Sequence, residues 1–153
     1  MDKIADLVET WHVRKLLCIL FIFIASACDT FPRVKTDLPW QEGFFDQNCI
    51  QKAINSVSHV LFLELKVFHP KDTCVVGECL EKTTRFNYNF SPELELKSPY
   101  HGSIDLNEYE GGKKTYQNYV NGQLGKRKFL GNEQAVFEKK LREINDSVKA
   151  SCK

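Results

Sequence analysis

The stretch FFDQNCIQKAINSVSHVLFLELKVFHP, residues 44–70, decides the fold because its hydrophobic period changes in the middle. In the first half, apolar residues recur at the spacings of an amphipathic helix, at Ile50, Ala53, Ile54 and Val57. Asp46 is placed to cap this helix. In the second half the period becomes two, which predicts a strand that ends at Pro70. We expect one face of this strand to carry Leu61, Leu63, Leu65 and Val67, and the other face to carry Glu64 and Lys66.

Further strands are predicted downstream. Residues 84–90 place Thr, Phe and Tyr on one face and Arg and Asn on the other. Shorter alternations at residues 93–97 and 103–107 indicate two more strands. The pair Asn121-Gly122 predicts a tight hairpin, because both central residues of such a turn need positive φ angles. These segments predict an antiparallel meander of about four to six strands.

The C-terminal segment predicts the clearest helix of the chain. Asn132 stands at its N-cap position, and Lys149 lies near its other end, where the helix dipole favours a positive charge. One apolar stripe runs along it at Phe137, Leu141, Ile144 and Val148. The order of elements predicts an α+β domain: an N-terminal helix, the meander, and a C-terminal helix packed on the sheet.

The N-terminal region contains a short apolar run, LLCILFIFIASA at residues 16–27, which follows Arg14 and Lys15. As a helix this run would be about 18 Å long, well below the roughly 30 Å hydrocarbon core of a bilayer. A basic flank, a short apolar stretch and small residues at its end are typical of a signal peptide. The alternative is a buried core helix, which in a small domain would have a polar face that this run lacks.

The end of this run, Ala25-Ser26-Ala27-Cys28, resembles the lipobox of bacterial lipoproteins. The resemblance implies that the Cys28 thiol receives a diacylglycerol and that Cys28 becomes the acylated first residue of the mature chain. Ala25 stands where the lipobox usually has Leu, and the same residues fit ordinary signal-peptidase cleavage without lipid. Asp29 resembles the signal that retains lipoproteins in the inner membrane of enteric bacteria.

Two prolines and mixed charges follow in residues 29–40, DTFPRVKTDLPW. This composition predicts an extended tether between the lipid and the folded part. The predicted organisation is a signal peptide over residues 1–27, a lipidated tether over 28–40, and a single α+β domain over 41–153.

The chain has six cysteines. Removal of the signal peptide and lipidation of Cys28 leave an even set of four, at Cys49, Cys74, Cys79 and Cys152. An even set fits two disulfides in an oxidising compartment, and four cysteines allow three pairings. Cys49 and Cys152 both lie near apolar helix stripes, which favours a bond between the two helices. Cys74 and Cys79 would then close a short loop.

No cluster of residues predicts a catalytic or metal site. His69, Cys74 and Cys79 are candidate metal ligands, but their spacing lacks the C-x-x-C pair common in zinc sites and favours a disulfide. A hydrolase that uses Glu93 with His69 or His101 is an alternative, although the sequence has no G-x-S-x-G motif. We therefore expect no cofactor, no metal and no enzymatic activity.

The formal net charge is +1, which gives no general attraction to nucleic acid. A basic cluster is expected to be solvated: Lys113, Lys114, Lys126, Arg127 and Lys128. These features predict a non-enzymatic lipoprotein, anchored through Cys28 on the periplasmic face of a bacterial inner membrane. It would bind an envelope protein, for example in immunity, exclusion or envelope stress. The alternatives are an outer-membrane location, a secreted disulfide-bonded protein without lipid, and a small periplasmic hydrolase.

Overall fold

The computed structural model describes residues 32–70, 74–75, 77–91, 94, 100–122, 129 and 131–153. The chain divides into two compact units, Met1–Thr30 and Phe31–Lys153. The predicted signal peptide, Cys28 and Asp29 lie outside the described residues. Within the described ranges, no helix is both long enough and apolar enough to cross a membrane.

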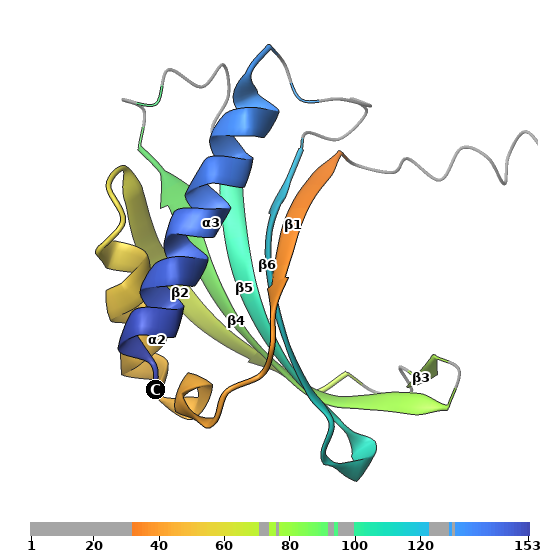
Figure 1. The fold of residues 1–153 in the computed structure, drawn as a ribbon. Helices are drawn as coiled ribbons and strands as arrows, with labels where there is room; N and C mark the ends of the chain where they lie inside the picture. Colours follow the sequence, from red (N-terminus) through yellow and green to blue (C-terminus); the bar gives the residue numbers. More distant parts are fainter. Residues whose placement is uncertain are drawn as a thin grey trace, which may run out of the picture. The chain divides into compact units, whose positions relative to one another are not determined.

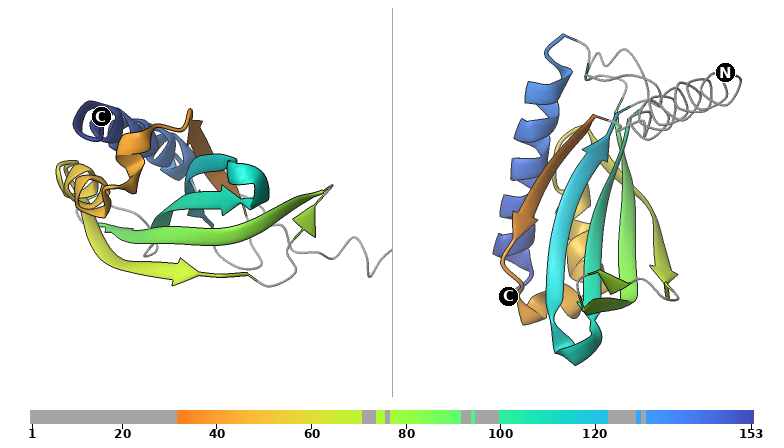
Figure 2. Two further views of the ribbon diagram at one scale, coloured as in Figure 1. Left: turned by 90° about the horizontal axis from the view of Figure 1, so that it is seen from below. Right: turned by 90° about the vertical axis from the view of Figure 1, so that its right-hand side faces the viewer.

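The second unit is a mixed α+β domain with an antiparallel sheet and two α-helices. In chain order the elements are β1 (Arg33–Leu38), the 3-10 helix η1 (Glu42–Phe45), α2 (Gln47–Asn55), β2 (Val60–Phe68), β3 (Cys74–Val75), β4 (Glu78–Phe90), β5 (His101–Tyr109), the 3-10 helix η3 (Glu110–Gly112), β6 (Lys114–Asn121) and α3 (Glu133–Ser151). The strand order is β1-β6-β5-β4-β2, and β3 pairs with β4. Both helices lie on one face of the curved sheet (Figures 1 and 2), which we call the inner face; the other is the outer face.

The helix predicted after Asp46 is α2. The Asp46 carboxylate accepts hydrogen bonds from the backbone N–H groups of Asn48 and Cys49, and so acts as the N-cap. The buried face of α2 is formed by Cys49, Ile50, Ala53 and Ile54. However, β1 precedes α2, so the domain does not begin with a helix as predicted.

The predicted tether is wrong for residues 33–38, which form the edge strand β1 and pair with β6. Val34 and Leu38 are buried on the inner face, and the charged residues between them are exposed. This alternation is a strand pattern, and Pro32 and Pro39 stand just outside it, where an edge strand tolerates proline. The folded domain therefore begins earlier than residue 41.

The predicted faces of β2 are wrong for Leu61 and Leu63, because the register to β4 shifts between Phe62 and Glu64, whereas Leu65 packs on the core with Glu64 and Lys66 exposed, as predicted. Such a bulge adds one residue to the strand and changes which side chains share a face. Phe62 and Leu65 are the residues that pack on the core, whereas Leu61 and Leu63 are exposed.

The hairpin predicted at Asn121-Gly122 is wrong. Asn121 pairs with Arg33 of β1, and the Gly122 N–H donates to the Pro32 carbonyl. The hairpin between β5 and β6 turns instead at η3, where Gly111 has a positive φ of 82°. Of the strand predicted at residues 93–97, only Leu94 lies in the described part, in a 3-10 conformation. The strand predicted at residues 103–107 is part of β5.

Helix α3 contributes an apolar stripe to the core. Its predicted stripe is fully buried, at Phe137, Leu141, Ile144 and Val148. Asn132 is at the N-cap position, but its side chain makes no capping hydrogen bond. The stripe packs on inner-face aromatic residues, and the Phe137 ring lies 5.2 Å from Phe90 and 4.8 Å from Tyr100 between centroids.

A buried polar network fixes α3 on the sheet, and Asn145 is at its centre. The Asn145 Oδ1 accepts from the Tyr116 hydroxyl and from Asn118 Nδ2, at 2.9 Å each. Its own Nδ2 donates to Thr36 Oγ1 at 2.8 Å, and the Tyr88 hydroxyl donates to Asn118 Oδ1 at 2.7 Å. Burial raises the pKa of the Tyr116 phenol, so this hydroxyl stays a donor. The network joins α3 to β1, β4 and β6.

We expect Asn145→Ala to lower the free energy of unfolding by about 2–4 kcal/mol, because several buried polar groups lose their partner. Urea denaturation measures this change. The matched control is Asn132→Ala on the same helix, whose side chain is exposed and makes no cap. We expect that variant to change the free energy by less than about 0.5 kcal/mol. Equal effects of the two variants would contradict the role of the network.

Two disulfides are present, with the predicted pairing: Cys49–Cys152 and Cys74–Cys79. Cys49 is in the first turn of α2 and Cys152 caps the C-terminal end of α3, with 5.6 Å between their Cα atoms. A Cβ at Gly43 would lie 2.7 Å from the Cys152 carbonyl, so glycine lets η1 pass beside this end of α3. Cys74 and Cys79 face each other across the β3–β4 pair.

The two disulfides should stabilise the domain by different amounts. They span 103 and 5 residues of sequence, respectively. In the chain-entropy model, Cys49→Ser with Cys152→Ser should cost about 4–5 kcal/mol, and Cys74→Ser with Cys79→Ser only about 2 kcal/mol. Urea denaturation of the two double variants tests this ranking, and a reversed order would refute it.

Candidate functional site

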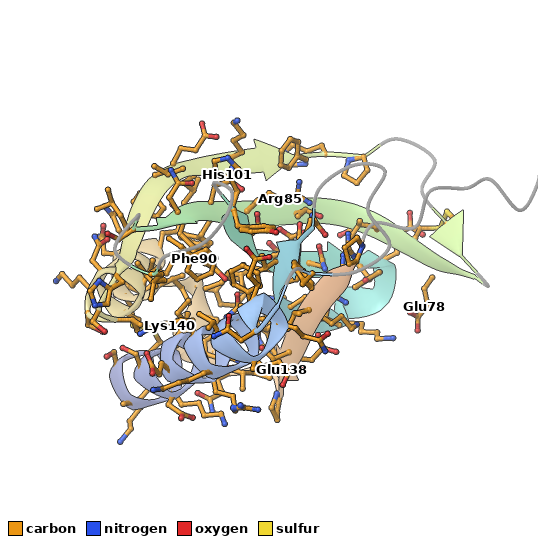
Figure 3. The ribbon with its side chains drawn as sticks, turned by 90° about the horizontal axis from the view of Figure 1, so that it is seen from above. Glu78, Arg85, Phe90, His101, Glu138 and Lys140 are labelled. Carbon is orange, nitrogen blue, oxygen red and sulfur yellow. A yellow bond between two sulfur atoms is a disulfide. The ribbon has the colours of Figure 1, made fainter. Side chains whose placement is uncertain are left out.

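The outer face of the sheet carries a row of side chains to which each of the five main strands contributes one residue. The members are Phe68 of β2, Arg85 of β4, Asp105 of β5, Tyr119 of β6 and Arg33 of β1. We call these five residues the arginine–aromatic row. Figure 3 shows Arg85 on the part of the sheet that lies away from α3, while Phe90 lies between the sheet and the helices.

The centre of the row is an ion pair between Arg85 and Asp105. These residues are cross-strand neighbours in the β4–β5 pair. Arg85 Nε and Nη2 donate to the two Asp105 carboxylate oxygens at 2.7 and 2.8 Å, which is bidentate geometry. The hydrogen bond to Asp105 raises the pKa of the Arg85 guanidinium. The Asp105 side chain is 9% exposed and that of Arg85 is 35% exposed, so the pair presents its cation to solvent.

Two aromatic rings flank this guanidinium. Its Cζ lies 5.3 Å from the centroid of Phe68 and 6.0 Å from that of Tyr119. The centroid of the Tyr119 ring also lies 4.7 Å from Cζ of a second guanidinium, that of Arg33. These distances are within the range of cation–π attraction. The Tyr119 hydroxyl also donates to Asp105 Oδ2 at 3.1 Å, and burial, followed by the Asp105 charge, raises the pKa of this phenol.

Cross-strand hydrogen bonds hold the outer face on both sides of the row. On one side Thr83 Oγ1 donates to Asn107 Oδ1 at 2.8 Å. On the other side Ser103 Oγ donates to Asn87 Oδ1 at 2.8 Å, and Asn87 Nδ2 donates to Glu64. The side chains of this face are therefore fixed before any ligand arrives, which lowers the entropy cost of binding.

The row combines features that are common in protein-binding surfaces. Arg and aromatic residues are enriched in the energetically important parts of interfaces. Here Phe68 is 40% exposed, and the guanidinium beside it is held at a fixed position. Such an arrangement suits a partner that offers a carboxylate or carbonyl oxygen to the cation and an apolar group to the ring.

The sequence did not predict this row. Phe68, Arg85 and Asp105 lie in segments correctly predicted as strands, Tyr119 lies beside the wrongly predicted hairpin, and Arg33 lies in the supposed tether. Alternation with apolar residues was a signal that Arg85 and Asp105 point away from the core. Which of them meet depends on the strand register, and this was not available from the sequence.

The alternative enzymatic residues do not assemble into a site in the described part of the chain. His101 contacts the Asn89 side chain on the neighbouring strand, and His69 is exposed just after β2. Glu93 lies outside the described residues. Among the described residues, no group of three or more His, Cys, Asp or Glu side chains is arranged to hold a metal ion. Cys74 and Cys79 form a disulfide.

The predicted basic cluster is only partly described, since residues 123–128 lie outside the described ranges. Lys113 forms an ion pair with Glu78, with 2.6 Å between Nζ and Oε1. Lys114 lies near Glu108 and above the Phe45 ring, 3.7 Å from its centroid. These two lysines therefore interact with acidic and aromatic neighbours within the domain.

Comparison with known proteins gives no assignment. No protein-family model, no curated protein and no solved structure matches this chain.

We expect Arg85→Ala to lower the free energy of unfolding by about 2–3 kcal/mol, because it leaves the nearly buried Asp105 carboxylate without its cation. The expected loss in free energy is smaller than that for breaking a fully buried ion pair, because Arg85 is partly exposed. Replacing both partners, as in Arg85→Met with Asp105→Leu, should recover most of the loss. Arg142→Ala, at an exposed position of α3, is the matched control. Urea denaturation distinguishes these results, and failure of the double variant to recover stability would contradict the ion-pair explanation.

Proposed function

We propose that this chain is a lipid-anchored periplasmic lipoprotein that binds an envelope partner through the arginine–aromatic row, without catalysing a reaction. The Cys28 lipid attaches it to the bacterial inner membrane, and Asp29 retains it there. The row, with its fixed Arg85 and half-exposed Phe68, is the observation that carries the binding proposal.

Support for the compartment comes from the cysteines. Two disulfides are formed by four of the six cysteines, and disulfides persist in oxidising compartments such as the periplasm. The sequence Ala25-Ser26-Ala27-Cys28 resembles a lipobox, and a multiply acylated cysteine gives a stable anchor. With Cys18 removed in the signal peptide, lipidation of Cys28 leaves no unpaired thiol on the mature chain.

Intact mass spectrometry of the protein from membranes tests the anchor. We expect wild type to have the mass of residues 28–153 plus acyl groups, with Cys49, Cys74, Cys79 and Cys152 resistant to alkylation. Cys28→Ala should lose the acyl mass and the membrane attachment. A wild-type mass of residues 28–153 without acyl groups, in the soluble fraction, would replace this proposal with that of a secreted protein.

Site-specific photo-crosslinking in cells tests the binding surface. Gln117 lies on the outer face beside the row, opposite Asp105, and Gln134 lies on α3. A benzophenone amino acid at position 117 of the full-length chain should give a discrete cross-linked product, whereas the same group at position 134 should not. Phe68→Ala should reduce the yield at position 117 by about tenfold, the loss of one well-placed interface side chain.

The matched control for this substitution is Phe45→Ala in η1, another exposed phenylalanine of the domain. It should leave the product at position 117 unchanged. Equal cross-linking at positions 117 and 134, or equal effects of the two phenylalanine substitutions, would refute the row as the binding surface.

A further inference from the structure

Strand β2 forms one edge of the sheet (Figure 1), and its neighbour in the strand order is β4. It exposes four large apolar side chains, Leu61, Leu63, Val67 and Phe68. Among the described residues, the opposite edge strand β1 exposes none. Soluble proteins usually protect their edge strands, because an apolar edge is a template for pairing with another strand.

The open part of this edge begins after Phe62. The Phe62 N–H donates to Asn55 Oδ1 at 2.9 Å, so this N–H is directed away from β4 and the end of α2 occupies the edge there. The bulge between Phe62 and Glu64 further separates this part from the rest of the strand. Residues 63–68 therefore form the segment that is open to another strand.

The charges of this segment are self-complementary. Glu64 and Lys66 are each about half exposed, and they flank Leu65. In an antiparallel pair of two copies with the twofold axis at Leu65, each Glu64 lies opposite the partner copy's Lys66. The same register places each exposed Leu63 opposite Val67. A twofold axis at Glu64 or at Lys66 would instead place like charges opposite each other, which is unfavourable.

We propose that two copies of this chain associate through antiparallel pairing of their β2 edges, with the twofold axis at Leu65. The pairing joins the two sheets into one continuous sheet and covers the exposed apolar side chains around Leu65. It leaves the inner faces with their helices unchanged. This inference does not require lipidation or partner binding by the arginine–aromatic row, although Phe68 belongs to both surfaces.

The test uses two differently tagged copies of the full-length chain, co-expressed and extracted in detergent. One tag is used to purify its copy, and the amount of the other tag that co-purifies measures the association of the two copies. Wild type should capture wild type. Glu64→Lys in both copies, or Lys66→Glu in both copies, places like charges at both contacts, and we expect capture to fall by about tenfold or more.

Mixing the two variants gives the decisive result. When one copy carries Glu64→Lys and the other carries Lys66→Glu, opposite charges again face each other at both contacts. We expect this mixed pair to be captured at the wild-type level. The double variant with both substitutions in each copy should also be captured, because its charges are exchanged but still complementary.

The chain offers a matched control on the other edge. In β1, Lys35 and Asp37 form an ion pair with the same two-residue spacing. Asp37→Lys should leave capture unchanged, and thermal unfolding of every variant should confirm that it is folded. The proposal is overturned if wild type does not capture wild type, if the single variants are captured normally, or if the mixed pair of folded variants is not restored.

Discussion

The position of α3 on the sheet depends on one buried amide, that of Asn145. Apolar stripes alone allow a helix to slide or rotate at modest cost, whereas a buried amide must satisfy its donors and its acceptor in one arrangement. Here Thr36, Tyr116 and Asn118 provide that arrangement from β1 and β6. The same interaction therefore ties the first strand of the domain to its last helix.

Local sequence patterns predicted the type of an element well where its hydrophobic periodicity was clear. The Asp46 cap with its helix, the stripe of α3 and the pairing of the four cysteines are all confirmed. Predictions that depended on register failed. Because of the bulge in β2, Leu61 is exposed while Leu65 packs on the core, although the two were expected on one face, and Asn121 pairs with β1 instead of forming a turn. A bulge and a long-range strand pair have no clear signal in a single sequence.

The side chains on the two faces of the sheet are stabilised in different ways. The inner face is covered by helices and closed by apolar packing around a few buried amides. The outer face has no helix on it among the described elements, and its side chains instead satisfy each other across strands, with Arg85 and Asp105 at the centre. The candidate site could be recognised only after the register was known, because its members come from five strands. The residues singled out from the sequence, Cys28 and Asp29, belong to the other unit of the chain.

Among the described elements, the covalent loop closed by Cys49 and Cys152 leaves out only β1, η1 and the first two residues of α2. Strand β1 is held by its ladder to β6, by the buried Val34 and Leu38, and by the bond from Asn145 to Thr36. A mechanical pull on the chain from its N-terminal side is therefore carried first by these non-covalent contacts. Under such a load β1 would separate from β6 while the disulfide still holds the two ends of the cross-linked part together, so the first strand sets the mechanical strength of the domain on this side.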